Sequence, residues 1–325
     1  MKYIATLISI LFALGTGHAQ TDATLVIGDF KITKITDADT FRFDKLDRPA
    51  RLLGIDTEET FKTPDAEQKT SEIAQNWDEF YKLQRGSSRF PVKTDSPMGF
   101  EAWKWAEEFM KDVDYVRLER EGDGRDKDIF DRYLVYVIAV KNGQEINYNV
   151  ECVRNGYSPY FNKYGNSKRF HNEFAEAQKY AMENKLGIWN PEKKKYPDYE
   201  ERLNWWNVRA VQLEQFAENH KGKEGYFDLN STEDYEKLSA FVGKEIVVFG
   251  GISNVMTDKF PYIFRIPIRK EMNFDLVVKQ SDSNVMDQID MDYLKEYYIY
   301  SKGILDTYDG RYQILIRDKD QIWME

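Results

Sequence analysis

Charged residues gather where short strands are predicted to end, and their order constrains how the first half of the chain folds. Residues 30–35 alternate between apolar and polar types and lead into the turn Asp37-Ala38-Asp39. Residues 50–55 form another apolar run, which ends at Asp56. Alternation with period two, followed by turn residues, predicts short strands. Acidic side chains at the ends of two neighbouring strands can converge on one point.

The residue types at these strand ends suit phosphodiester chemistry. Asp39 and Asp56 can hold a hard cation, because such cations prefer oxygen ligands. Arg51 and Arg132 can each grip a phosphate through two parallel hydrogen bonds, which a lysine cannot match. Glu59 can accept a proton from an attacking water. Together these residues predict metal-assisted cleavage of a phosphodiester.

Composition narrows the class of protein further. The 325 residues suit about two domains of roughly 150 residues each, and 42% hydrophobic residues are enough for packed cores. The formal net charge of −10 argues against a packaging protein that coats nucleic acid, because such proteins are basic. With three histidines and one cysteine, the chain is poorly supplied for a zinc site, a Ser-His-Asp triad or an internal disulfide. Cys152 lies in an apolar-patterned segment and is expected to be buried.

The first residues have the pattern of a secretory leader. Lys2 supplies a positive charge, residues 4–14 form a short apolar run, and Gly17-His18-Ala19 is a small-x-small cleavage site. We expect residues 1–19 to be removed and the protein to be exported, to the periplasm or the outside. A short membrane anchor is the alternative, although the run falls short of the roughly 20 residues of a span. No later apolar run reaches that length.

The remaining chain is predicted to form two domains, at residues 20–195 and 231–325, joined by a helical linker at residues 196–230. The linker carries Trp205 and Trp206, which are expected to pack between the domains. Helices of the first domain are predicted over residues 65–83, 100–112, 146–155 and 168–184. Strand-like runs of the second domain lie near residues 244–252, 261–268, 273–279, 297–305 and 311–317. The fold class is therefore mainly β with helices (α+β), and five short strands suggest that the second domain is a small OB-like barrel.

Taken in order, the motifs of the first domain resemble the staphylococcal nuclease (thermonuclease) family over about residues 26–189. The Asp-Gly-Asp-Thr turn of that family is similar to residues 37–40, and its Arg-Leu-Leu strand ending in Asp-Thr-Pro-Glu-Thr is similar to residues 51–60. Its acidic loop ending in Gly-Arg is similar to residues 128–132, and its closing Leu-x-Ile-Trp to residues 186–189. The resemblance implies a five-stranded, OB-fold-type barrel with nuclease activity.

The resemblance also implies roles for single residues. The carboxylates of Asp39 and Asp56 would bind a calcium ion, together with the backbone carbonyl of Thr57. Glu59 would orient or deprotonate the attacking water. Two arginines would hold the scissile phosphate, Arg51 and Arg132.

The implied substrates are DNA and RNA, preferably single-stranded or frayed, with cleavage of the 5′-O–P bond that leaves 3′-phosphates. Tyr164 matches a family tyrosine that packs on the nucleotide. Phe130 takes one position of a Lys-Tyr pair that contacts the terminal phosphate in the family, and it is kept here as a candidate substrate contact.

Several positions depart from the family pattern. Ala38 replaces a turn glycine and must avoid a positive φ. Glu58 replaces a proline, which predicts a looser loop before the candidate base. Asp131 replaces a glycine and places a negative charge beside Arg132. Segment 61–97 is longer than the corresponding family loop and is a candidate cover for the substrate cleft. Further nucleotide contacts of the family are replaced at Ile129, Phe130 and Asn162.

Two other functions stay open. One is a catalytically weak or inactive nucleic-acid-binding module of the same fold, which Asp131 and the missing Lys-Tyr pair favour. The other is a protein-interaction scaffold, which the acidic net charge favours. The acidic run 123–128 lacks the EF-hand pattern and is expected to be a solvated loop. Residues 193–195, three lysines, are expected to be solvated linker, with contact to a nucleic-acid backbone as the alternative.

Overall fold

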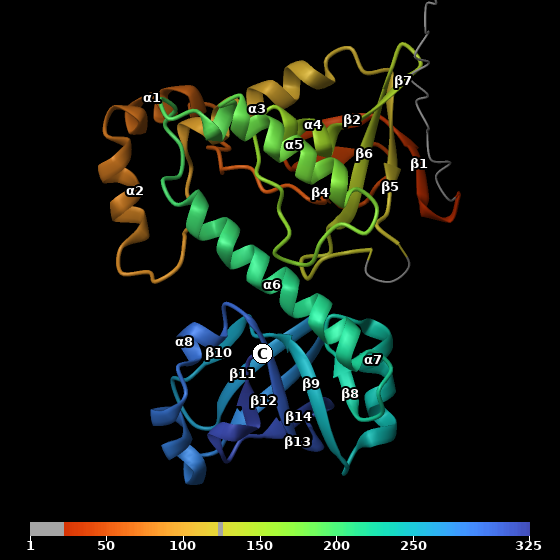
Figure 1. Cartoon of the computed structure of the whole chain (residues 1–325), viewed down its shortest axis with the longest axis vertical. Helices are drawn as coiled ribbons and strands as arrows, with labels where there is room; N and C mark the ends of the chain where they lie inside the picture. The colour runs from red at the N-terminus through yellow and green to blue at the C-terminus, as the bar shows by residue number, and fades with distance from the viewer. Residues whose placement is uncertain (1–22, 123–125) are drawn as a thin grey trace, which may run out of the picture.

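A computed structural model describes residues 23–122 and 126–325 as two bodies joined by a long helix (Figure 1). The predicted leader, residues 1–19, lies outside the described residues, as do residues 123–125 of the acidic run. Within the described part of the chain, no helix has the length and apolar character needed to cross a membrane. The structure combines several sheets and helices, in keeping with the predicted mixed class.

The first body is built on a seven-stranded sheet in the order β1-β5-β6-β4-β3-β2, with β7 paired to β6. Its strands are β1 (Val26–Phe30), β2 (Ile32–Asp37), β3 (Thr40–Phe43), β4 (Ala50–Leu52), β5 (Tyr115–Glu119), β6 (Tyr133–Lys141) and β7 (Gln144–Asn147). Five strands were predicted here. There are two additional strands. One arises because Lys31 interrupts the extended segment and separates β1 from β2, and the other, β7, follows a turn at Asn142 and Gly143 and pairs with β6. Closure of the sheet into a barrel stays a prediction.

The helices of the first body are α1 (Ala66–Gln75), α2 (Trp77–Arg85), α3 (Pro97–Met110), α4 (Tyr148–Arg154) and α5 (His171–Glu183). The single helix predicted over residues 65–83 is interrupted at Asn76, because the buried Trp77 packs with Tyr81 and Tyr196. The helix predicted from residue 146 begins at Tyr148, where the side chain of Asn147 caps it.

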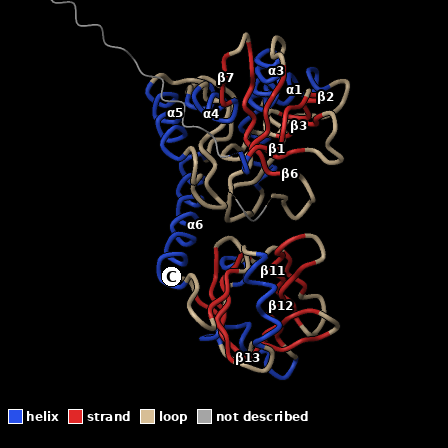
Figure 2. The backbone as a smooth tube through the Cα atoms, turned by 90° about the vertical axis from the view of Figure 1, so that its right-hand side faces the viewer, coloured by secondary structure: helices blue, strands red, loops and turns tan. Residues whose placement is uncertain are grey.

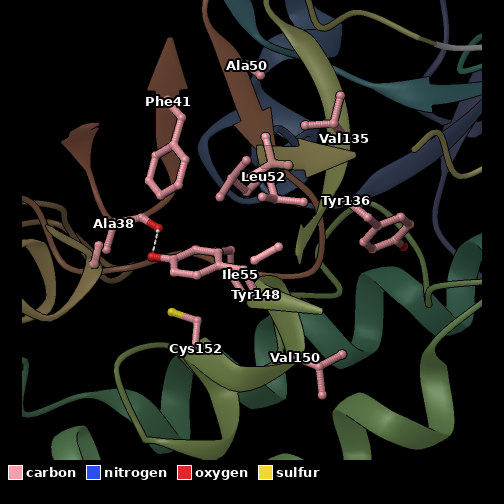
Figure 3. Packing of buried hydrophobic residues seen from close by; sticks show 14 of the residues in the cluster. Ala38, Phe41, Ala50, Leu52, Ile55, Val135, Tyr136, Tyr148, Val150 and Cys152 are labelled. Atoms are coloured by element: carbon pink, nitrogen blue, oxygen red, sulfur yellow. Dashed lines mark hydrogen bonds between the residues drawn. The ribbon is translucent and has the colours of Figure 1, made fainter. Parts of the chain in front are cut away.

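The core of the first body extends beneath the turn between β2 and β3. Tyr148 is buried, and its hydroxyl donates a hydrogen bond to the carbonyl of Ala38 at 2.8 Å (Figure 3). The ring of Phe41 packs on Tyr148 with 5.2 Å between centroids. Ala38 is not among the described residues with a positive φ, so the turn forms without its glycine. Cys152 is buried as predicted, and this burial raises the pKa of its thiol well above the usual range.

The second body contains an eight-stranded sheet in the order β10-β11-β12-β14-β13-β9-β8, with β15 paired to β13. Its strands are β8 (Tyr226–Asp228), β9 (Glu245–Gly251), β10 (Asn254–Met256), β11 (Tyr262–Arg269), β12 (Met272–Val278), β13 (Tyr298–Tyr308), β14 (Arg311–Leu315) and β15 (Ile322–Trp323). The five predicted runs coincide with β9, β11, β12, β13 and β14, while the unpredicted strands are the shortest. Two helices accompany the sheet, α7 (Thr232–Lys237) and α8 (Met291–Leu294).

Helix α6 (Tyr199–His220) spans from one body to the other (Figure 2). Toward the first body, Trp206 meets Phe161 edge to face with 4.7 Å between ring centroids. Toward the second body, the indole N–H of Trp205 donates to the carbonyl of Glu296 at 2.7 Å. The two tryptophans therefore pack between the bodies, as predicted.

The start of α3 lies against the loop that carries Glu58 and Glu59. A Cβ added at Gly99 would stand 2.0 Å from the carbonyl oxygen of Glu59 and 2.7 Å from that of Glu58. We expect Gly99→Ala to lower the free energy of unfolding by about 1–3 kcal/mol, because two backbones must separate to admit the methyl group. Urea unfolding followed by tryptophan fluorescence measures the change. Gly122→Ala is the control, since an added Cβ there meets nothing within 4 Å. Equal stability of the two variants would contradict this packing.

Candidate functional site

Arg51 on β4 lies between the two carboxylates that were predicted to bind a metal. Its two terminal nitrogens contact Asp39 and Asp56, and one of them also donates to the carbonyl of Ile55 at 3.2 Å. Pairing of β3 with β4 sets Thr40 opposite Arg51, which brings the turn holding Asp39 beside the end of β4. The two acids therefore lie within the span of one guanidinium.

Backbone and hydroxyl groups hold Asp39 in place. The N–H of Thr57 donates to its Oδ2 at 2.9 Å, and the hydroxyl of Thr40 donates to its Oδ1 at 3.1 Å. Burial raises the pKa of Asp39 to about 6; Arg51 opposes the rise, whereas the charges of Asp37 and Asp56 add to it. A buried carboxylate crowded by other acids is stabilised by a cation beside it.

Asp56 has a second cationic partner, which sequence reasoning missed. The ammonium of Lys93, from segment 61–97, lies 2.5 Å from Asp56 Oδ1. Burial acts to raise the pKa of Asp56, but Lys93 and Arg51 outweigh it and hold the pKa below its usual range. The backbone N–H of Asp56 donates to the hydroxyl of Ser158 at 2.8 Å, which fixes the end of the strand from another segment.

Glu59, the candidate base, lies beside the same lysine. Its carboxylate is 3.9 Å from the ammonium of Lys93 and 3.5 Å from that of Lys62. Lys62 also lies 2.9 Å from Asp37, whose second oxygen is buried without a hydrogen-bond partner. The side chain of Glu59 is 34% exposed, so water can reach its carboxylate, as a general base requires.

Glu58 fixes the loop that it was expected to loosen. It is buried, and its Oε1 accepts hydrogen bonds from the backbone N–H of Tyr196 at 2.7 Å and from the hydroxyl of Tyr199 at 2.8 Å. The hydroxyl of Tyr196 in turn accepts the N–H of Thr94 at 2.9 Å. The loop before Glu59 is therefore anchored to the start of α6. Lys193, which was expected to be solvated linker, pairs with Glu101 of the first body at 2.7 Å.

Arg132 pairs with an acid outside the group formed by Arg51, Asp39 and Asp56. Its Nε donates to Asp128 at 2.7 Å, and its backbone N–H donates to the same carboxylate at 2.9 Å. It immediately precedes Tyr133, which pairs with Ala50 at the start of β4. It thus lies near the strand of Arg51, yet no hydrogen bond or ion pair found in the described part of the chain links it to Asp39 or Asp56.

The residue before Arg132 adopts a backbone conformation that suits glycine. Asp131 has a φ of 67°, in the left-handed region that side chains other than glycine rarely adopt. Its carboxylate pairs with Arg48 at 3.1 Å and with Lys127 at 3.1 Å. The added negative charge is therefore shared with two other cations and does not bear on Arg132 alone.

The two predicted substrate contacts present their rings to solvent. Phe130 is 72% exposed and Tyr164 is 64% exposed. The guanidinium of Arg132 lies 5.6 Å from the ring centre of Phe130, and that of Arg209 lies 5.9 Å from the ring centre of Tyr164. Exposed rings beside guanidinium groups are suited to stacking with bases next to a phosphate backbone.

The donor set fits a hard cation bound by few side chains. Within residues 23–122 and 126–325, no group of three or more His, Cys, Asp or Glu side chains is arranged to hold a metal. The ligands expected from the sequence are the carboxylates of Asp39 and Asp56 and the backbone of Thr57. Oxygen ligands of this kind suit calcium when waters complete the coordination. Burial is the main cause of the raised pKa of Asp39, and a cation bound beside this carboxylate would lower that pKa.

No sequence motif indicated that three lysines, Lys62, Lys93 and Lys163, would lie near the candidate site. Lys62 and Lys93 belong to segment 61–97, whose extra length was the sole indication that it would reach the cleft. Lys163 packs its ammonium 3.7 Å from the ring centre of Trp205. Burial and, to a smaller extent, Arg209 lower the pKa of Lys163 to about 7, although the charges of Glu296 and Asp56 act to raise it.

The buried Glu58 predicts a pH dependence of stability. Burial raises its pKa from the usual 4.5 to about 7, and hydrogen bonds from Ser96, Tyr196 and Tyr199 offset only part of this rise. Between these pH values the folded state binds more protons than the unfolded state, so the free energy of unfolding falls as pH rises. Glu58→Gln keeps the acceptor oxygen without the charge. We expect the variant to flatten this dependence and to be more stable than wild type at pH 8 by about 1–3 kcal/mol. Urea unfolding at pH 5 to 8 measures both, and parallel pH profiles would refute the assignment.

Comparisons with known proteins match part of this chain. Residues 49–191 match the family model described as staphylococcal nuclease homologue. The chain is also 28% identical over 162 residues to an uncharacterized protein of Methanocaldococcus jannaschii, which covers 49% of this chain and 70% of that protein. Candidate residues inside the family match are Arg51, Asp56, Thr57, Glu59, Phe130, Arg132 and Tyr164.

The family match begins later than the predicted residues 26–189, so Asp39 lies before it. This kind of domain indicates a nuclease or nucleic-acid-binding function and, as an enzyme, a nucleic-acid hydrolase in general. The rest of the chain is larger than the matched domain. Residues 49–191 therefore form a domain of the staphylococcal nuclease homologue family.

Proposed function

We propose that this protein is a calcium-dependent endonuclease that hydrolyses DNA and RNA. The observation that carries the proposal is the position of Arg51, whose guanidinium contacts both Asp39 and Asp56 at neighbouring strand ends. Glu59 lies within 3.9 Å of a lysine that also contacts Asp56. Two carboxylates, a paired arginine and a water-accessible acid are the parts needed for metal-assisted attack on a phosphodiester.

The residues divide the chemistry as follows. Calcium, held by Asp39, Asp56 and the Thr57 carbonyl, would supply Lewis-acid neutralisation of phosphate charge. Arg51 would then turn its two-pronged guanidinium from the carboxylates to the phosphate oxygens on which negative charge grows. Glu59 would accept the proton of the attacking water while the bond to the 5′ oxygen breaks and a 3′-phosphate is left. To bind the guanidinium of the second arginine, Arg132, a substrate phosphate would have to displace the carboxylate of Asp128.

The exposed aromatic residues support a single-stranded substrate. Phe130 and Tyr164 can stack on unpaired bases, whereas bases inside a duplex are already stacked on each other.

We further propose that the leader pattern in residues 1–19 directs export to the periplasm or the outside. We also propose that both bodies are OB-like barrels, on the strength of the strand orders given above. The second body has no assigned role in the reaction.

The nuclease proposal predicts calcium-dependent cleavage that needs Arg132. The purified protein is incubated with 5′-labelled single-stranded DNA in calcium or in a chelator, and fragment size is followed. We expect fragments ending in 3′-phosphate in calcium and none in the chelator. Arg132→Ala should reduce kcat roughly a hundredfold or more, because a charge-stabilising donor is lost. Arg154→Ala is the control, as Arg154 pairs with Glu151 on α4. Failure of the folded wild type to cleave in calcium would leave the binding-module alternative.

The substrate contact predicts a change in KM. Tyr164→Ala should raise KM for single-stranded DNA roughly tenfold with little change in kcat, since a stacked base contributes about 1–3 kcal/mol. Tyr308→Ala is the matched control, because Tyr308 is 69% exposed and lies in the second body. Steady-state kinetics on short oligonucleotides separate the two parameters. Equal KM values for both variants would remove Tyr164 from the substrate site.

A further inference from the structure

An irregular segment, residues 89–96, connects the second body with the candidate site, and we call it the strap. At its first end, Arg89 pairs with Asp290 at 2.7 Å. The next residue, Phe90, packs in a cluster of rings with 5.5–6.1 Å between centroids. The partners of Phe90 in this cluster are Trp205, Tyr293 and Tyr297. One end of the strap is thus bound to α6 and to residues around α8.

The other end of the strap is bound to the catalytic loop. The N–H of Ser96 donates to the carbonyl of Glu59 at 3.0 Å. The N–H of Thr94 donates to the hydroxyl of Tyr196 at 2.9 Å, and the carbonyl of Val92 accepts from Tyr81 at 3.4 Å and from Arg202. Because the backbone is held on both sides of Lys93, the base of this side chain has a fixed position.

The ammonium of Lys93 lies against one carboxylate oxygen of Asp56, a candidate ligand of the proposed cation. Its distance to Asp56 Oδ1 is 2.5 Å, within the range of about 2.3–2.6 Å over which calcium binds oxygen. The side chain of Lys93 is 45% exposed, so the ammonium can swing into solvent. That of Asp56 is 4% exposed, so its carboxylate cannot follow. Arg51 and Lys93 already contact the same oxygen of Asp56, so a calcium ion bound there would be repelled by the Lys93 ammonium unless that side chain moved away.

The proposed function supplies the cation with which Lys93 competes. We propose that Lys93 is a further positioning residue of this site, that it sets the affinity for calcium by competing for Asp56, and that the second body holds it there through the strap. Removal of this charge leaves a more negative site. The remaining acids are Asp37, Asp39, Asp56 and Glu59, against Arg51 and Lys62.

The test is a calorimetric titration of the full protein with calcium chloride alone, without nucleic acid. Lys93→Met removes the charge but keeps the length of the side chain, and we expect it to bind calcium roughly tenfold more tightly or better. Lys93→Arg keeps the charge and should restore an affinity close to that of wild type. Lys82→Met, on the exposed surface of α2, is the matched control and should bind like wild type.

The outcomes separate this inference from the proposed function. Tighter binding by Lys93→Met alone supports the competition. Equal calcium affinity in wild type and Lys93→Met overturns it while leaving the nuclease proposal intact. No calcium binding by either protein overturns the metal site itself, and the competition with it. A raised KM for DNA in Lys93→Met with unchanged calcium affinity would make Lys93 a phosphate contact and overturn the inference.

The role of the second body is tested at the far end of the strap. Phe90→Ala removes the ring that packs against the second body and keeps the lysine at position 93, which is then no longer held against Asp56 by the strap. We expect this variant to bind calcium more tightly than wild type and less tightly than Lys93→Met. If thermal unfolding shows that Phe90→Ala does not fold, Arg89→Ala is the milder variant, because it removes only the ion pair between the strap and Asp290. If Phe90→Ala and Arg89→Ala both fold and bind calcium with wild-type affinity, the proposal that the second body holds Lys93 at Asp56 is wrong.

Discussion

Two carboxylates that are buried side by side require a positive partner, and Arg51 supplies it between Asp39 and Asp56. Burying unpaired charge is strongly unfavourable, so the turn before β3 and the end of β4 can approach only with this guanidinium between them. The β3–β4 register places the arginine there, and the N–H of Thr57 completes the arrangement. The same contacts leave Glu59 just beyond the buried acids, where water can reach it.

Segments distant in sequence keep this acid group rigid. Tyr148 supports the turn from below through the carbonyl of Ala38 (Figure 3). Ser158 holds the end of the strand at Asp56, and Gly99 lets α3 lie directly against the loop of Glu58 and Glu59. Preorganised groups are more effective in catalysis than groups that must reorganise during the reaction. The fold therefore supplies a rigid base for acids, while lysines on longer, more exposed side chains surround them.

Sequence patterns predicted the strands and turns that depend on neighbouring residues, but not the contacts between segments far apart in the chain. Strand alternation and turn residues located the main strands of both bodies, and ordered motifs brought Arg51 together with both acids. The break at Asn76 was missed, because it depends on Trp77 packing against a residue far along the chain. The contact of Lys93 with Asp56 was missed for the same reason, since an irregular segment carries no periodic signal. Proximity of Arg132 to the acids was implied by resemblance, whereas here its nearest partner is Asp128.

The contact of Glu58 with the first turn of α6 also bears on how such a chain can be assembled from modules. Tyr196 and Tyr199 follow the family match, which ends at residue 191, yet they complete the hydrogen bonds of a loop inside it. A fragment ending at residue 195 would leave the Glu58 carboxylate without either donor. A recombinant protein with a different second body would therefore have to keep the beginning of α6 together with the matched domain. In this protein the segment needed to complete the candidate site is therefore longer than the matched family domain.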